Sequence, residues 1–127
     1  MCLIDYIRIM RDGYAICYVE HPTDAMKKMA VRQNGFALQF IPDATRDMQR
    51  LAIGQNPFAI ECVEYPTLDM VLMACRVNPR SLLYVRNLTP DISLRVVEMD
   101  WHLIEYIRDV TNDMILEMVV QLMLQKK

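Results

Sequence analysis

All five threonines of this 127-residue chain stand 22 residues apart. They are Thr23, Thr45, Thr67, Thr89 and Thr111. A fixed period of about 20 to 50 residues is the sequence signature of stacked repeat proteins, so this spacing constrains the fold more than any local pattern does. It predicts one small unit copied five times, with each copy packed on its neighbours.

Each copy contains two helical patterns. In the first copy, apolar residues at Ala15, Ile16, Tyr18 and Val19 follow a spacing of i, i+1, i+3 and i+4, which is typical of a helix rather than an alternating strand. A second stripe of this kind follows each threonine, for example at Met26, Met29, Ala30 and Gln33. We therefore expect a short helix and a long helix in every copy. A strand in place of the short helix remains an alternative, because these segments are brief and rich in β-branched and aromatic residues.

The polar positions that repeat between the stripes fit helix caps. Each threonine precedes a long helix and can accept a bond from a free backbone N–H. Asp47, Asp69, Asp91 and Asp113 then fall in the first helical turn, where the helix dipole favours a carboxylate. A column of Asp12, Asn34, Asn56, Asn78 and Asp100 precedes the short helices in the same way. Pro57 and Pro79 follow at the first helical position, and Gly13 and Gly35 there also suit the end of the long helix.

These caps divide the chain into one repeat domain. The repeats cover residues 1–22, 23–44, 45–66, 67–88 and 89–110, and a terminal helix covers 111–127. The predicted fold class is all-α: an α-solenoid-like stack of five 22-residue helix-turn-helix repeats plus a C-terminal helix. Asp5 and Arg8 argue against a secretory leader. With no apolar run of membrane-spanning length, we expect a cytoplasmic protein.

Composition narrows the function classes. The formal net charge is -2, and the basic residues are spread evenly along the chain, which argues against a nucleic-acid partner. The alternative of a nucleic-acid binder depends on the early long helices, which carry Lys27, Lys28, Arg32, Arg46 and Arg50.

The four cysteines are not spaced for a metal site, so we expect buried free thiols in a reducing compartment and no metal. The eleven methionines lie mostly on the long-helix stripe, where filling the core is the favoured role and a methionine-lined binding groove is the alternative. Only three glycines are present, so there is no phosphate-binding loop. We expect no enzyme, no catalytic residue and no cofactor.

The candidates for function are two regions in which the residues depart from the repeated pattern. One is a position directly after the Gly/Pro turn, which we call the variable column: Tyr14, Phe36, Phe58, Arg80 and His102. In stacked repeats such a column faces one surface and is a usual place for partner contacts. The alternative is that these rings pack over neighbouring turns. The other region is the apolar last helix, where we expect a homodimer through Met114, Ile115, Met118, Val119, Leu122 and Met123.

Three phrases of the sequence resemble a known repeat family. They are residues 30–38 (AVRQNGFAL), 52–60 (AIGQNPFAI) and 64–67 (EYPT). The family is described as a domain of unknown function with the pattern A-V-x-x-N-G-x-A-L and a following P-T, and similar repeats are known in giant viruses, large bacteriophages and some bacteria. The resemblance covers nearly the whole chain, apart from Leu3 and Leu122, which replace an acid and a cap. It implies a short helical repeat and no catalytic residues.

Together these features favour a non-enzymatic module that binds a protein. The resemblance implies a small viral or phage accessory protein that blocks a host or cellular protein, for example a CRISPR or other defence component. A self-associating structural protein is a further alternative.

Overall fold

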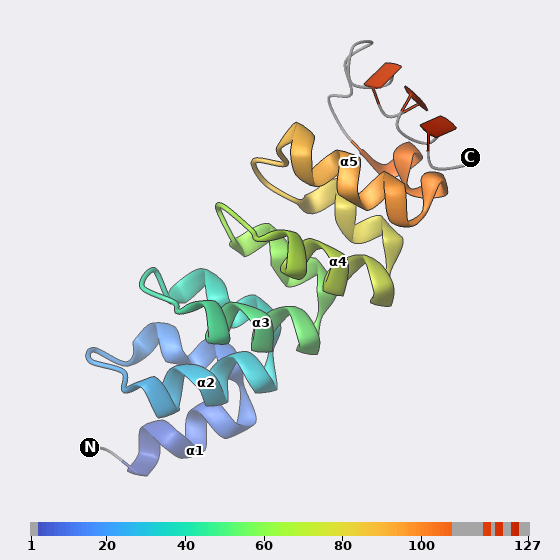
Figure 1. Cartoon of the computed structure of the whole chain (residues 1–127). Coiled ribbons are helices and arrows are strands. Elements are labelled where there is room, and N and C mark those ends of the chain that lie inside the picture. The colour runs from blue at the N-terminus through green and yellow to red at the C-terminus, as the bar shows by residue number, and fades with distance from the viewer. Residues whose placement is uncertain (1–2, 108–115, 118, 121–122, 125–127) are drawn as a thin grey trace.

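The computed structural model describes residues 3–107, 116–117, 119–120 and 123–124, and this part of the chain contains helices and no strand. Five α-helices alternate with five 3-10 helices (Figure 1). The α-helices are α1 (Leu3–Arg11), α2 (Asp24–Gln33), α3 (Arg46–Gln55), α4 (Leu68–Val77) and α5 (Pro90–Met99). The 3-10 helices are η1 (Gly13–Tyr18), η2 (Gly35–Phe40), η3 (Pro57–Cys62), η4 (Pro79–Tyr84) and η5 (Trp101–Tyr106). The all-α prediction is confirmed for these residues.

The threonines begin the α-helices as predicted. Thr23, Thr45, Thr67 and Thr89 have extended backbones, and each side-chain oxygen accepts a hydrogen bond of 3.2 to 3.3 Å from the N–H three residues later. Such a cap contributes about 1 kcal/mol to helix stability. The fifth threonine, Thr111, lies outside the described residues.

One residue both ends each α-helix and begins the next 3-10 helix. The N–H of Asn34 donates to the carbonyl of Ala30 at 2.9 Å, and its Oδ1 accepts from the N–H of Phe36 at 3.0 Å. The other members of its column, Asp12, Asn56, Asn78 and Asp100, form the same pair of bonds. The extended backbone at this residue turns the chain between the two helices.

The short helices are 3-10 rather than α-helices, which changes the set of buried residues. With about three residues per turn, side chains at i and i+3 eclipse one another. Gly35, Leu38 and Ile41 form such a row and are all buried. The prediction that the Tyr18 column belongs to the buried stripe is wrong, because Tyr18 is 83% exposed and Phe40 is 40% exposed.

Gly13 and Gly35 serve close packing and not a left-handed helix end. Neither has a positive φ, so the predicted glycine C-cap is not formed. A Cβ atom on Gly13 would lie 2.5 Å from the carbonyl oxygen of Ala30, and one on Gly35 would lie 2.5 Å from that of Ala52. These glycines allow each 3-10 helix to approach the α-helix of the following copy.

At the same glycines, a hydrogen bond joins successive copies. The N–H of Gly13 donates to Oε1 of Gln33 at 2.6 Å, and the N–H of Gly35 donates to Oε1 of Gln55 at 2.6 Å. Where the glycine is replaced by Pro57 or Pro79, which have no N–H, the residue 20 positions later is apolar: Val77 or Met99. The donor and its acceptor are therefore present together or absent together.

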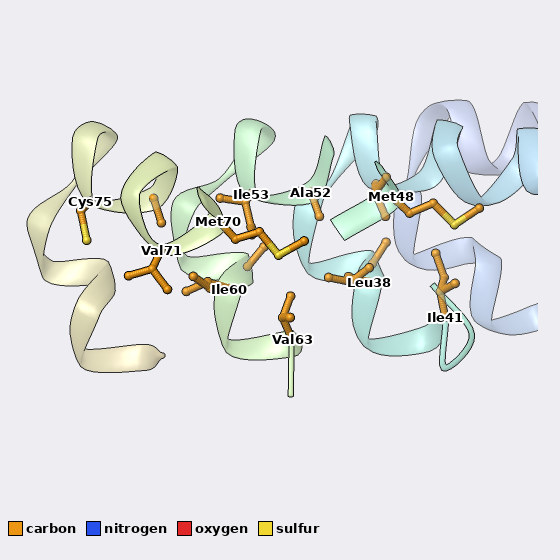
Figure 2. Close-up of a cluster of buried hydrophobic side chains, with 14 of the residues drawn as sticks. Leu38, Ile41, Met48, Ala52, Ile53, Ile60, Val63, Met70, Val71 and Cys75 are labelled. Atoms are coloured by element: carbon orange, nitrogen blue, oxygen red, sulfur yellow. The ribbon is translucent and has the colours of Figure 1, made fainter. Parts of the chain in front are cut away.

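Each α-helix contacts the next α-helix, and each 3-10 helix contacts the next 3-10 helix. Figure 1 shows the α-helices in chain order, from α1 (blue) to α5 (orange). The core between them is continuous, and Figure 2 shows Met48 and Met70 lying between neighbouring helices. Met26, Met48 and Met70 are at most 2% exposed, so the core-filling role is confirmed for them.

Two hydroxyl groups are buried without hydrogen-bond partners near the fourth copy. Ser81 stands in a column otherwise filled by Ala15, Ala37, Ala59 and Leu103, and Ser93 replaces Val71. Neither hydroxyl oxygen has a partner among the described residues. Burial raises the pKa of the neighbouring Cys75 thiol to about 11. A buried unpaired hydroxyl costs about 1 to 3 kcal/mol, which weakens the core here.

The bond between Gly35 and Gln55 predicts a measurable cost of removing its acceptor. Gln55→Ala leaves the N–H of buried Gly35 without a partner, so we expect the free energy of unfolding to fall by about 1 to 2 kcal/mol. Urea unfolding monitored by circular dichroism measures this change. Val77→Ala is the matched control, since Val77 occupies the same column opposite a proline and is 64% exposed. Equal midpoints for the two variants would contradict the role given to Gln55.

Candidate functional site

The variable column occupies the second position of every 3-10 helix. The backbone N–H of each member is held by the cap two residues earlier at 3.0 Å, so all five side chains start from the same local geometry. Tyr14 is 37% exposed, Phe36 and Phe58 are half-buried, and Arg80 and His102 are exposed. The column therefore lies at the surface, but its side chains differ in how far they are exposed.

Two members of the column pack on the next 3-10 helix and not on one another. The rings of Tyr14 and Phe40 meet edge to face with centroids 5.9 Å apart, and those of Phe58 and Tyr84 do so at 5.2 Å. Each pair spans 26 residues and joins adjacent copies. For Tyr14 and Phe58, this geometry favours the alternative that the rings pack over neighbouring turns.

Aromatic residues gather on the 3-10 helices far beyond the variable column. The chain has six tyrosines, three phenylalanines and one tryptophan. All of them except Tyr6 and Tyr65 lie in the 3-10 helices. We call this set the aromatic layer: Tyr14, Tyr18, Phe36, Phe40, Phe58, Tyr84, Trp101 and Tyr106. Tyr18 and Trp101 are its most exposed members, at 83% and 60%. The sequence pattern missed both, although counting aromatics per segment would have found them.

The last 3-10 helix carries a compact polar and aromatic group. The indole of Trp101 stacks on the imidazole of His102, with centroids 3.8 Å apart. Nδ1 of His102 lies 3.0 Å from Oδ1 of Asp100. This hydrogen bond, together with the one from the backbone N–H of His102, lowers the pKa of Asp100 below its ordinary value. The group presents a rigid, exposed aromatic surface at η5.

The α-helices carry ion pairs that neutralise part of the predicted basic surface. Nζ of Lys27 lies 2.9 Å from Oδ2 of Asp43, and Nε of Arg50 lies 3.2 Å from Oδ2 of Asp69. The hydrogen bond from Lys27 lowers the pKa of Asp43. Two of the five cations proposed for nucleic-acid contact are thus paired with carboxylates, Lys27 within its own copy and Arg50 with the following copy.

The three cysteines that the structure describes differ in burial. Cys75 is buried and Cys62 is half-buried, but Cys17 is exposed, so the prediction of a buried thiol is wrong there. Burial, followed by the charge of Glu61, raises the pKa of Cys62 above its ordinary value. A raised pKa keeps a thiol protonated at neutral pH and therefore weakly nucleophilic. Cys2 lies outside the described residues.

Only part of the predicted dimer surface is described by the structure. Val119 and Met123 are 43% and 65% exposed, whereas Met114, Ile115, Met118 and Leu122 lie outside the described residues. At the opposite end, α1 exposes Leu3, Ile4, Ile7 and Met10. Among the helices that the structure describes, none has the length and apolar character needed to span a membrane.

A double-mutant cycle tests whether the Phe58 ring stabilises the fold through its contact with Tyr84. For Phe58→Ala and Tyr84→Ala we expect a coupling of about 1 kcal/mol in the free energy of unfolding, because the edge-to-face contact is lost once, not twice. Urea unfolding of the four proteins measures it. The control cycle combines Phe58→Ala with Tyr18→Ala, which should be additive because η1 and η3 are not adjacent and do not contact one another. Additivity in both cycles would show that the ring contact contributes nothing.

A comparison with known proteins finds no family profile, no curated protein and no solved structure that matches this chain. The functional argument therefore depends on the residues of the chain itself.

Proposed function

We propose that the chain is an elongated stack of helical repeats that binds another protein through the aromatic layer and performs no catalysis. The sequence period and the contacts of each helix with its equivalent in the next copy support the stack. The concentration of exposed aromatic side chains on the 3-10 helices carries the proposal for binding. Tyrosine and tryptophan are the residues most enriched at binding hot spots.

The rigidity of the layer supports the same function. Edge-to-face contacts and capped backbones hold Tyr14 and Phe58 in place before binding, so less conformational entropy is lost on association. Tyr18 and Trp101 add apolar area that is already exposed. Such a surface suits a protein partner, because its charged groups are few and its aromatic groups carry both apolar faces and polar edges.

The resemblance to viral and phage repeats supports a more specific version of the proposal. A small cytoplasmic accessory protein without chemistry of its own acts by covering part of a partner. The partner would be a host protein, for example a CRISPR or other defence component, whose working surface the aromatic layer blocks. This version draws on the resemblance and on size, and not on a residue of the site.

Replacing the two most exposed residues of the aromatic layer by alanine tests the proposal. We expect Tyr18→Ala combined with Trp101→Ala to reduce capture of the partner from a lysate of the native host at least tenfold, because hot-spot aromatics carry most of the binding energy. Quantitative mass spectrometry of the captured proteins measures the loss. Far-ultraviolet circular dichroism should be unchanged, since neither side chain is in the core.

The control for this experiment is Val77→Ala combined with Met99→Ala. Both residues are at least half exposed but lie at the ends of α4 and α5, outside the aromatic layer. Capture that falls equally in the control, or that survives loss of the aromatics, would overturn the proposed surface.

Self-association through the last helix is a second candidate, favoured by the exposed apolar side chains of Val119 and Met123. We expect light scattering to give twice the chain mass of 14.9 kDa. Val119→Glu with Met123→Glu should return it to a single chain, because a charge on an apolar interface is costly to bury. Val77→Glu is the matched control. A mass of one chain at every protein concentration would exclude the homodimer.

A further inference from the structure

Two hollows lie along the loops that lead from a 3-10 helix to the next α-helix. The first has a volume of about 530 Å³ and the second about 640 Å³. Most residues that line the first have a counterpart 22 residues later in the lining of the second. They are thus the same groove in successive copies, and the differences between them show what each copy has changed.

In the first hollow, the positive charge is satisfied within the chain. Nζ of Lys27 lies 2.9 Å from Oδ2 of Asp43 and 4.0 Å from Oδ1 of Asp24. The lysine side chain is only 12% exposed. This ion pair neutralises the charge of Lys27, so the lysine has little attraction left for an external anion.

In the second hollow, all three of these residues are different. Gln49 stands in place of Lys27, Tyr65 in place of Asp43, and Arg46 in place of Asp24. The cation is still present, now as a guanidinium, but the carboxylate that would pair with it has been replaced by a tyrosine. Neither Arg46 nor Arg86, which also lines the hollow, forms an ion pair with any residue that the structure describes.

Three hydrogen bonds hold one nitrogen of the Arg46 guanidinium, and the longest runs 4.0 Å from Nη1 to Sδ of Met70. Nη1 donates to Oε1 of Gln49 at 3.0 Å and to the carbonyl oxygen of Tyr65 at 2.9 Å. All three use the same nitrogen, so Nε–H and Nη2–H have no bond to a described residue. These two N–H groups form the side-on edge that receives the two oxygens of a carboxylate.

The rest of the lining suits a carboxylate that is attached to an apolar group. Leu38, Ile41 and Pro42 supply apolar walls. Tyr65, a residue that is 65% exposed, also lines the hollow. The lining of the second hollow contains two arginines and one acidic residue, Glu64. The lining of the first hollow contains one lysine, Lys27, and two acidic residues, Glu20 and Asp43.

We propose that the second hollow is a binding site for a carboxylate attached to an apolar group, with Arg46 as the residue that recognises it. The ligand supplies the carboxylate that the first hollow holds within the chain. Arg86 adds a second positive charge at the rim. The site is separate from the aromatic layer and does not depend on the function proposed for it.

An NMR titration of the full ¹⁵N-labelled chain tests the site with phenylacetate as the probe. We expect saturable shifts of the Arg46 Nε–H resonance and of the backbone amides of residues 38–49. The neutral analogue 2-phenylacetamide should bind at least tenfold more weakly, because it has the same ring without the charge. Equal binding of acid and amide, or no saturable shift with phenylacetate, would overturn the proposal.

Two binding-site variants and one control variant distinguish a loss of binding from a loss of folding. Arg46→Gln should weaken phenylacetate binding at least tenfold, whereas Arg76→Gln, an exposed arginine of α4 outside the lining, should leave it unchanged. The triple variant R46D/Q49K/Y65D installs the residues of the first hollow, a combination this fold already accommodates. It should also lose binding at least tenfold. Wild-type affinity in Arg46→Gln or in the triple variant would contradict the assignment.

A second pair of probes identifies the source of the carboxylate. The capped peptide acetyl-Leu-Glu-Leu-amide carries the acid on a polypeptide, and acetyl-Leu-Gln-Leu-amide is its neutral control. Tighter binding of the glutamate peptide than of phenylacetate assigns the site to an acidic side chain of a protein. The opposite order assigns it to a free small acid. Binding of both peptides with equal affinity would contradict recognition of the carboxylate.

Discussion

The structure depends most on one side chain that closes one helix and opens the next. At Asn34 the backbone N–H completes the last turn of α2 while Oδ1 receives the first free N–H of η2. Because the same residue performs both tasks, no loop separates the two helices and their relative direction is set locally. Recurrence of this junction at Asp12, Asn56, Asn78 and Asp100 gives every copy the same shape, so that equivalent faces meet from copy to copy.

Much of the fold is predictable from the sequence because caps are local. A threonine accepts a bond from the N–H three residues later, and an asparagine from the N–H two residues later, so both can be placed without knowledge of packing. The type of the short helix was not predictable in this way. Over six residues, a stripe at i, i+1, i+3 and i+4 fits about 3.0 or 3.6 residues per turn equally well.

The candidate surfaces were harder to predict than the fold. The variable column was found by its irregularity, whereas the exposure of Tyr18 and Trp101 is seen only in the folded structure. The bond from Gly35 to Gln55 spans 20 residues and could be found only by comparing columns in different copies. The hollow at Arg46 required three-dimensional contacts, because its difference from the first hollow is a missing partner and not a recognisable motif.

The exchange of glycine for proline along the chain has a consequence for how the molecule comes apart. The first copies are joined by the bonds of Gly13 to Gln33 and Gly35 to Gln55, and the ion pair of Arg50 with Asp69 joins the third copy to the fourth. Further along, Pro57 and Pro79 lack the donor, and the unpaired hydroxyls of Ser81 and Ser93 weaken the core. Among the described α-helices, each one contacts only those before and after it. We therefore expect the contacts of η4 and α5 to open before those of α2.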